Sequence, residues 1–465
     1  MTLIKSISGI RGVIGGKVGE SLSPIDVVRY TSAFGTWVKK QSLKQKPTLI
    51  IGRDARISGD MIRQLVTSTL QALGVDVYDL GLSTTPTVEL AVQIQNADGG
   101  IILTASHNPK QWNALKLLNE KGEFISADDA AEVLAFAHTD DYTFVGVNDL
   151  GKYYYDDTYI QKHIDSVLKL KWVNSDAIKA ANFRVVVDAV NSTGGIAVPA
   201  LLESLGVSCI PLYCEPNGHF PHNPEPLAEH LTEISKLVVE SNADCGIVVD
   251  PDVDRLAFVN ENGTMFGEEY TLVACADYIL SKQKGNTVSN LSSSRALREI
   301  THRYGGQYFY SAVGEVNVVN KMKECNAIIG GEGNGGIIFP ESHYGRDSIV
   351  GIALFLSLLA EKKMKCSKLR ASYPSLFMSK NKIQLTPEID VNKILSAISK
   401  KYSNEDVTTI DGVKIDFPEE WVHLRKSNTE PVIRIYTESV SKENADDLAE
   451  RFINEIKELT ISIRR

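Results

Sequence analysis

The hexapeptide TASHNP, residues 104–109, places a hydroxyl, an imidazole and an amide directly after the apolar run GIIL. Ser106 in such a loop could be a nucleophile or a phosphate carrier, and the Asn-Pro pair ends the local structure. Lys110 and Lys116 add positive charge that suits an anionic substrate. Taken alone, the stretch also fits an ordinary serine-containing turn, in which His107 is a hydrogen-bonded loop residue.

Three aspartates alternate in the segment DPDVDR, directly after the apolar run GIVV: Asp250, Asp252 and Asp254. On one face of a strand, or turned inward by a tight loop, they repel one another unless a cation neutralises them. Such hard oxygen ligands suit Mg²⁺. An EF-hand is the rival interpretation because Glu261 falls at its twelfth position, but Arg255 stands where glycine is needed. A solvated acidic turn is a weaker alternative, since it does not need three aspartates.

Two further loops carry groups suited to a phosphorylated sugar. GEGNGG, residues 331–336, sets Glu332 among glycines, where its carboxylate could accept hydrogen bonds from two neighbouring hydroxyls. RKSNTEPVIR, residues 425–434, has the composition of a phosphate-binding nest between two arginines. Alone, the first loop is equally consistent with a flexible turn, and the second with a serine/threonine turn in a hairpin.

Arginines close to small residues occur in two N-terminal stretches. SGIRGVIGG contains Arg11, and GRDARISG contains Arg53, Asp54 and Arg56. Both stretches could be plain surface, but an arginine enclosed by small residues is suited to a buried anion.

An internal triplication predicts the elements that position these loops. Residues 48–81, 183–213 and 287–314 repeat one plan of strand, polar loop, helix and strand. Downstream of the first two, NADGGIILTASHNP aligns with NADCGIVVDPDVDR, so Ser106 superposes on Asp252. NAIIGGEGNGG resembles a third copy. Because ligands collect where the strands of open α/β sheets end, three equivalent loops are expected to face one cleft.

The chain is therefore predicted to form three similar mixed-sheet α/β domains and a smaller α+β C-terminal domain around one central cleft. The predicted domains are residues 1–152 with the TASHNP loop, 153–258 with the aspartate loop, 259–373 with GEGNGG, and 374–465 with RKSNTEP. In the last domain IDF, WVHLR and VIRIYTES are expected to be strands, and ENADDLAERFINEIKEL an amphipathic helix.

Composition narrows the class of protein. A chain of 465 residues is too long for one hydrophobic core, and a formal charge of −9 argues against nucleic-acid binding. Six scattered cysteines without a CxxC pair favour reduced thiols. The longest apolar helical stretch, IALFLSLLA, is too short to cross a bilayer. We expect a cytoplasmic protein without a membrane or nucleic-acid partner, as a monomer or homodimer.

Together, TASHNP, DPDVDR, GEGNGG and RKSNTEP resemble the motifs of the α-D-phosphohexomutase family in order and spacing. This family comprises the phosphoglucomutases/phosphomannomutases and the phosphoglucosamine mutases, and the resemblance covers essentially the whole chain. The first, second and fourth motifs are highly specific, whereas GEGNGG is a variant. The family fold, four domains around one cleft with the first three alike, agrees with the triplication.

The resemblance implies a role for each candidate residue. Ser106 would be the phosphoserine, and with Asp250, Asp252 and Asp254 it would hold one Mg²⁺ per chain. The phosphoserine and the reacting hydroxyl would be lined by Arg11, His107, Lys116 and Arg255. The sugar and its own phosphate would be bound by Glu332, Asn334, Arg425, Ser427, Asn428, Thr429 and Arg434.

The implied reaction interconverts hexose 6-phosphate and hexose 1-phosphate. Phosphoserine gives its phosphoryl group to the free hydroxyl, the hexose bisphosphate turns end for end in the cleft, and the other phosphate returns to Ser106. Mg²⁺, Arg11 and Lys116 would offset the charge on the transferred group. Lys116 or His107 would be the general acid/base, and both assignments stay open. The C-terminal domain would close over the sugar and exclude water.

Departures from the family pattern concern the sugar. Many members have a histidine at the end of the sugar loop, where this chain reads Asn334, Gly335, Gly336. Some members have histidine after a Val-Gly pair, where this chain has Glu315. A lysine that some relatives have in the third repeat is missing from SNLSSSR. The GEGNGG form favours a phosphoglucosamine mutase. The alternatives are a phosphoglucomutase/phosphomannomutase, a metal-dependent phosphatase with a phosphoserine intermediate, and a non-catalytic sugar-phosphate- or Ca²⁺-binding module.

Overall fold

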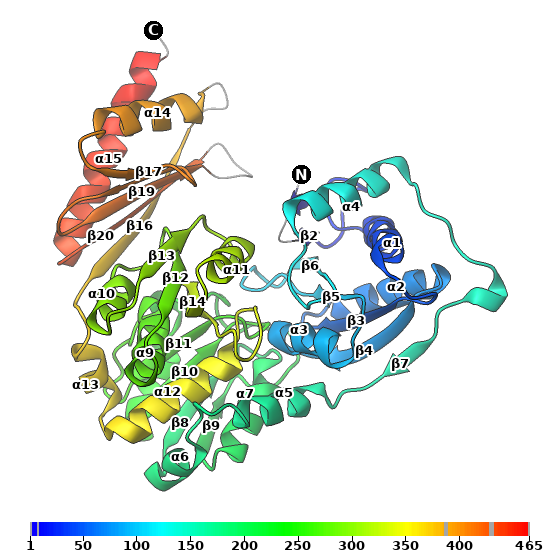
Figure 1. Ribbon diagram of the computed structural model, residues 1–465, viewed down its shortest axis with the longest axis horizontal. Helices are drawn as coiled ribbons and strands as arrows, with labels where there is room; N and C mark the ends of the chain where they lie inside the picture. Colours follow the sequence, from blue (N-terminus) through cyan, green and yellow to red (C-terminus); the bar gives the residue numbers. More distant parts are fainter. Residues whose placement is uncertain (1, 7–8, 386–388, 427–431, 464–465) are drawn as a thin grey trace. The chain divides into compact units, whose positions relative to one another are not determined.

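Three of the four β-sheets in the computed structural model repeat one order of strands (Figure 1). The structure describes residues 2–6, 9–385, 389–426 and 432–463. The chain divides into two units: unit 1 comprises residues 1–282 and 334–369, and unit 2 comprises residues 283–333 and 370–465.

The first sheet, in unit 1, has seven strands in the order β1-β2-β6-β5-β3-β4-β7. β3 pairs in parallel with β4 and β5, and β4 pairs in parallel with β7. The remaining pairs, β1–β2, β2–β6 and β5–β6, are antiparallel, so the sheet is mixed. The strands are β1 (Ile4–Ser6), β2 (Gly9–Val13), β3 (Thr48–Arg53), β4 (Asp76–Leu82), β5 (Gly99–Leu103), β6 (Trp112–Leu118) and β7 (Tyr153–Tyr155).

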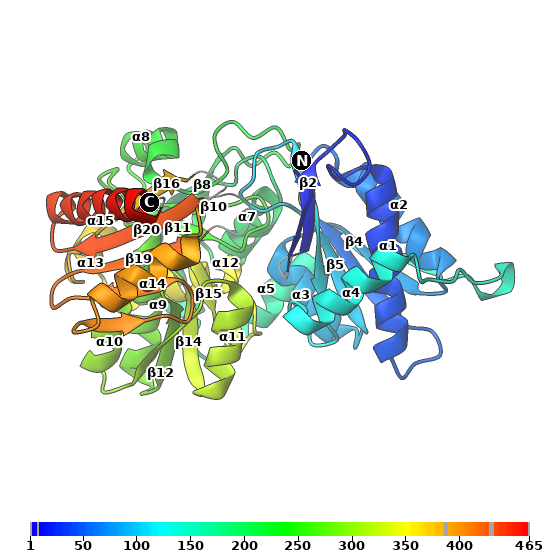
Figure 2. The same cartoon turned by 90° about the horizontal axis from the view of Figure 1, so that it is seen from above.

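Alternating side chains divide the core of this sheet between its two faces. Leu49 and Ile51 of β3 pack with apolar residues of α1, α2 and α4, whereas Ile50 packs with those of α3. Figures 1 and 2 show α1 and α2 on the same side of the sheet. α1 and α4 each begin at a serine that forms a capping box, Ser23 and Ser126. The helices are α1 (Pro24–Gln41), α2 (Gly59–Ala72), α3 (Thr85–Ile94) and α4 (Ala127–Thr139).

The second sheet, also in unit 1, has the order β11-β10-β8-β9, in which only β11 is antiparallel to its neighbour. Its strands are β8 (Arg184–Asp188), β9 (Ser208–Leu212), β10 (Cys245–Val249) and β11 (Leu256–Asn260). The helices along this part of the chain are α5 (Tyr159–Leu168), α6 (Ser175–Ala181), α7 (Gly194–Ser204), α8 (Thr232–Glu240) and α9 (Glu268–Lys282). Short 3₁₀ helices occur at Val147–Asp149 and Ala228–His230.

The most apolar helix of the chain is α12 (Ser348–Lys362), which contains IALFLSLLA. It packs against α9, α6 and α5, and all its residues from Ser348 to Ala360 are buried. α12 is therefore an internal helix of unit 1. α13 (Cys366–Ala371) follows it and leads into unit 2.

The third sheet has the order β13-β12-β14-β15, and the boundary between the units runs through the loop that joins β14 to β15. β12 pairs in parallel with β13 and β14. Its strands are β12 (Asn286–Asn290), β13 (Tyr308–Ser311), β14 (Ala327–Glu332) and β15 (Gly336–Ile338), and its helices α10 (Ala296–Arg303) and α11 (Glu315–Glu324).

The strand orders confirm the triplication. The runs β6-β5-β3-β4, β11-β10-β8-β9 and β15-β14-β12-β13 place equivalent strands at equivalent positions. The TASHNP and DPDVDR loops follow β5 and β10, and GEGNGG begins in the last two residues of β14; these are the same strand of each repeat. The boundaries near residues 152, 259 and 373 and the single cleft remain predictions.

The last sheet, in unit 2, is antiparallel with the order β16-β20-β19-β18-β17. One face is covered by α14 and α15, whose apolar residues share a core with the strands. The expected strands and terminal helix are all present, which confirms the α+β class. The elements are β16 (Phe377–Gln384), α14 (Val391–Lys401), β17 (Asp406–Thr408), β18 (Val413–Asp416), β19 (Trp421–Lys426), β20 (Val432–Ser439) and α15 (Lys442–Ile463).

Among the residues that the structure describes, none of the helices has the length and apolar character needed to cross a membrane.

Candidate active site

Ser106 lies just beyond β5 and is only 7% exposed. Its backbone has a φ of 48°, in the left-handed region that residues with a side chain rarely adopt. The Ser106 N–H donates to Thr104 Oγ1 at 2.9 Å, and its Oγ donates to Asp250 Oδ2 at 2.7 Å. The loop therefore turns the serine hydroxyl directly towards the aspartate loop.

Arg56 holds the Ser106 loop in this conformation. Its side chain is fully buried and its Nε lies 3.0 Å from Asp54 Oδ2. Asp54 also accepts a hydrogen bond from Thr104 Oγ1 at 2.6 Å. The guanidinium donates to the carbonyl oxygens of four loop residues: Ser106, Asn108, Pro109 and Trp112. Arg56 therefore pairs with a carboxylate of the chain itself, that of Asp54. Burial raises the pKa of Asp54, although the charge of Arg56 acts in the opposite direction.

The three aspartates lie in a tight loop between β10 and β11. All are fully buried, and one carboxylate oxygen of each lies within 4.8 Å of the others. Asp250 accepts the Asp254 and Arg255 N–H groups at 3.2 Å. Oδ1 of Asp252 and Oδ1 of Asp254 have no hydrogen-bond partner in the described part of the chain. Buried carboxylate oxygens without a donor fit a hard divalent cation.

Two cations and a hydroxyl contact the aspartates from other elements. Lys116 Nζ, from β6, lies 2.7 Å from Asp252 Oδ2 and 3.5 Å from Asp254 Oδ2. Arg346 Nη2 lies 2.6 Å from Asp254 Oδ2. Thr85 Oγ1, at the start of α3, donates to Asp252 Oδ2 at 2.7 Å. The loop is therefore neutralised in part by residues from the first repeat and from the segment before α12.

These contacts separate the pKa values of the buried groups. Burial, together with Asp252 and Asp254, raises the pKa of Asp250 well above its usual range. Burial also disfavours the charge of Asp252, but Lys116 outweighs it and lowers the Asp252 pKa. For Lys116 itself, burial opposes the charge and the two carboxylates more than compensate, so its pKa is raised. Asp252 and Lys116 therefore form an ion pair beside a carboxyl group that resists ionisation.

His107, Arg11 and Arg255 complete the charged surroundings of Ser106. Burial, followed by the charge of Arg255, lowers the pKa of His107 well below its ordinary value. Burial and the same arginine lower the pKa of Arg11, which lies on β2. Arg255 Nη1 is 3.1 Å from Glu225 Oε1. His107 Nδ1 is buried and has no hydrogen-bond partner among the described residues.

In unit 2, Glu332 ends β14 and is 4% exposed. Its Oε1 accepts hydrogen bonds from Asn290 Nδ2 at 2.8 Å and from the Gly314 N–H at 3.1 Å. Asn290 is the last residue of β12 and Gly314 lies shortly after β13, so the carboxylate lies where the strand ends of that sheet meet. In unit 1, Asn334 Oδ1 accepts the Gly336 N–H at 3.1 Å.

The arginines of the last sheet lie opposite each other on neighbouring strands, Arg425 on β19 and Arg434 on β20. Arg425 Nε is 2.9 Å from Asp411 Oδ2, which also accepts the Val313 N–H at 3.0 Å. Arg434 is exposed. The three predicted phosphate ligands of this turn, Ser427, Asn428 and Thr429, lie outside the described residues.

Comparisons with known proteins place the chain in a family. Models of domains I, II and III and of the C-terminal domain of phosphoglucomutase/phosphomannomutase match residues 3–143, 161–263, 267–377 and 382–455. The chain belongs to this family. Its predicted membership, its reaction class as a phosphohexose mutase and its isomerase class are thereby confirmed.

Individual relatives agree with this assignment. A phosphoglucomutase/phosphomannomutase of Thermococcus kodakarensis is 34% identical over 454 residues, 97% of each chain. A phosphoglucosamine/phosphogalactosamine mutase of Sulfurisphaera tokodaii is 32% identical over 462 residues, again 97% of each chain. The crystal structure of a family protein from Burkholderia thailandensis has a TM-score of 0.84 at 25% identity and covers 98% of both chains.

Two residues that contact the aspartates, Arg346 and Thr85, were not identified from the sequence. Arg346 lies in SHYGRDS, where a glycine and an aspartate flank it as they flank Arg53, and this similarity is the signal that could have singled it out. Thr85 follows another threonine before a proline, a pattern that indicates only a helix start.

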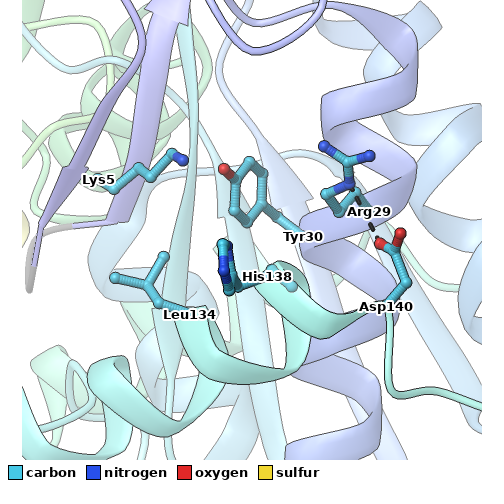
Figure 3. A pocket seen from close by; sticks show the side chains of 7 residues that line it. Lys5, Arg29, Tyr30, Leu134, His138 and Asp140 are labelled. Carbon is cyan, nitrogen blue, oxygen red and sulfur yellow. Dashed lines mark ion pairs between the residues drawn. The ribbon is translucent and has the colours of Figure 1, made fainter.

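A surface hollow of about 380 Å³ lies between α1 and α4. Its lining includes Lys5, Arg29, Tyr30 and His138 (Figure 3). Arg29 Nε is 3.3 Å from Asp140 Oδ1 across one side. None of the residues that line it belongs to the Ser106–aspartate cluster. The hollow is therefore separate from the candidate active site.

Proposed function

We propose that this enzyme interconverts glucosamine 6-phosphate and glucosamine 1-phosphate through a phosphoserine at Ser106 and a hexose bisphosphate intermediate. The relative from Sulfurisphaera tokodaii carries a name of this substrate class, and the relative from Thermococcus kodakarensis is named for glucose and mannose phosphates. The GEGNGG form of the sugar loop favours glucosamine. Phosphoglucomutase/phosphomannomutase activity is the alternative.

The hydrogen bond from Ser106 Oγ to Asp250 Oδ2 is the observation that carries the proposal. It brings the hydroxyl from β5 onto the aspartate loop after β10, although the two residues are 144 positions apart. A serine in this position can receive a phosphoryl group and return it, because the loop fixes Oγ and positive charges surround it.

We assign one Mg²⁺ per chain to Ser106 and the three aspartates, Asp250, Asp252 and Asp254. Their burial, their mutual closeness and the oxygens without donors on Asp252 and Asp254 support this set. A bound Mg²⁺ supplies positive charge that stabilises the charge on the transferred group.

The chain's own cations extend this stabilisation. Lys116 and Arg346 already contact the aspartates, and Arg11 and Arg255 lower the pKa of His107 through their charge. Because the phosphoryl-transfer transition state spreads negative charge over its oxygens, fixed cations at this place lower its free energy.

We propose that His107 accepts the proton of the attacking sugar hydroxyl, and that Lys116 acts as a fixed charge. Burial lowers the pKa of His107, so it is a neutral base at neutral pH. Lys116 is paired with Asp252 and stays an ammonium. When the intermediate returns its second phosphate to Ser106 Oγ, the same imidazole gives that proton to the sugar oxygen that leaves.

In unit 2 we propose that Glu332 binds two sugar hydroxyls, with Asn334 of unit 1 beside it in the chain. The substrate's own phosphate is assigned to Arg425, Ser427, Asn428, Thr429 and Arg434. The hydrogen-bonded position of Glu332 at the strand ends supports a fixed carboxylate there. We further propose a cytoplasmic enzyme, monomeric or homodimeric, whose non-protein partner is the phosphosugar.

A coupled assay with the 6-phosphates of glucosamine, glucose and mannose, with glucose 1,6-bisphosphate as activator, tests the substrate. We expect the highest kcat/KM for glucosamine phosphate and no turnover of any sugar by Ser106→Ala. A preference for glucose or mannose phosphate would contradict the sugar assignment but not the mutase reaction. Release of inorganic phosphate in place of the isomer would contradict the reaction itself.

A further inference from the structure

A second group of metal-type ligands lies in unit 1, away from the three aspartates. His163 of α5 and His343 and Asp347, which precede α12, are all at most 3% exposed. One ligand atom of each lies within 4.8 Å of the other two. None of these residues has a part in the mutase reaction proposed above.

Both imidazoles direct the same nitrogen towards one carboxylate oxygen. Nε2 of His163 lies 2.9 Å from Asp347 Oδ2, and Nε2 of His343 lies 3.2 Å from the same atom. The other oxygen, Oδ1, accepts the Ile349 and Val350 N–H groups at the start of α12. Ligands of a tetrahedral zinc ion are separated by about 3.3 Å, given metal–ligand bonds of about 2 Å, so this triangle is close to the required size.

The second nitrogen of His163 has a hydrogen-bond partner, and that of His343 lies near a carboxylate. Nδ1 of His163 lies 2.9 Å from Thr87 Oγ1, and Nδ1 of His343 lies 3.4 Å from Glu89 Oε2. Glu89 and Thr87 both belong to α3 and are buried. A carboxylate or hydroxyl on the far nitrogen of a histidine is the usual outer contact of a metal ligand, because it selects the tautomer that binds through Nε2.

The types of ligand favour one class of metal. Two imidazoles and one carboxylate suit a first-row transition metal rather than Mg²⁺, which prefers oxygen.

We propose that His163, His343 and Asp347 bind a divalent transition-metal ion of the Zn²⁺ class, with Glu89 and Thr87 as their outer partners. The ion joins α3, α5 and the start of α12. α3 also carries Thr85, which bonds Asp252, and the segment before α12 carries Arg346, which bonds Asp254. The site therefore has a structural role that supports the aspartate loop.

Titration of the chelator-treated full-length protein with Co²⁺ in excess Mg²⁺ tests the site. We expect one equivalent of Co²⁺ to give a visible ligand-field spectrum, with imidazole scattering in X-ray absorption. The spectrum should be lost in His163→Gln and His343→Gln. It should persist in Asp250→Asn, which alters the other cluster, and in His302→Gln, which changes an exposed histidine of α10.

Two results would overturn the proposal. One is a Co²⁺ spectrum that disappears in Asp250→Asn and survives both histidine variants. The other is X-ray absorption of the wild-type protein with oxygen scatterers alone, a result that does not depend on whether the histidine variants fold. Either would mean that the cluster is a protonated hydrogen-bond network.

Discussion

The chemistry of single residues in this enzyme depends on what burial does to their charge. Asp252 and Lys116 stabilise each other as ions, whereas burial, and after it the neighbouring aspartates, raise the pKa of Asp250. His107 is held neutral by burial and by Arg255. One small volume therefore holds an ammonium, carboxylates of different acidity and a neutral base, as proton and phosphoryl transfer at one centre require.

His423 offers a titration that is separate from catalysis. On β19 its Nε2 lies 2.6 Å from the Asp411 carbonyl oxygen and its Nδ1 lies 2.8 Å from Ser292 Oγ. Burial lowers its pKa to about 4. Since the unfolded chain then binds the extra proton more readily, the free energy of unfolding should be highest above about pH 6.5 and fall between about pH 6.5 and pH 4.

Urea unfolding followed across this pH range checks the prediction. The wild-type free energy of unfolding should decrease with acid, by at most about 1.4 kcal/mol per pH unit from this residue, and His423→Gln should flatten the slope. His302→Gln, at an exposed site, serves as the control. An identical slope in wild type and His423→Gln would disprove the assignment.

At the scale of elements, a strand and its following loop deliver each functional group, and other elements hold the loop. β5 ends at Leu103, after which the loop depends on Arg56, which comes from the loop after β3. Repeat equivalence predicts that Ser106 and Asp252 occupy corresponding positions in their loops, but it does not predict which aspartate the hydroxyl contacts. In the structure the hydroxyl donates to Asp250.

Replacing Arg56 should therefore damage both stability and turnover. Arg56→Ala leaves Asp54 buried without its cation and removes the donor to four carbonyl oxygens. We therefore expect the free energy of unfolding to fall by about 3–5 kcal/mol and kcat to be lower. Arg29→Ala is a matched control, because its pair with Asp140 is largely exposed and contributes about 1 kcal/mol or less. Chemical unfolding and the mutase assay measure both; equal effects of the two variants would contradict this role.

At the scale of the whole molecule, the sequence predicted the triplicated fold and the Ser106–aspartate cluster because each depends on a contiguous motif after a buried strand. Arg346 belongs to no such motif. Its flanking glycine and aspartate resemble those of Arg53, but they do not indicate its contact with Asp254, 92 residues away. The role of Arg56 was also hidden, because its partners are backbone carbonyls. Ser427, Asn428 and Thr429 lie outside the described residues, so their part in phosphate binding stays a prediction.

The proposed roles divide between the units, and this division predicts how variants affect substrate choice. Lys116 in unit 1 acts on the transferred phosphoryl group, so Lys116→Met should lower kcat/KM for glucosamine, glucose and mannose phosphates by a similar factor. Glu332 in unit 2 is proposed to bind sugar hydroxyls, so Glu332→Gln should change the ratios of kcat/KM between the sugars. We expect a change of about tenfold, because that is the factor lost with a hydrogen bond to a charged group. Steady-state kinetics with the three sugars measures both, and unchanged ratios in Glu332→Gln would contradict its assignment.

Ser106 as the phosphate carrier is the central claim, and intact mass spectrometry with peptide mapping tests it most directly. After treatment with glucose 1,6-bisphosphate, the protein should gain one phosphoryl group on the peptide that contains Ser106 and lose it when hexose monophosphate is added. Ser204→Ala, at a serine of α7 outside the site, should behave like wild type. Failure to detect phosphate on Ser106 after this treatment, in a protein that still turns over substrate, would contradict the mechanism.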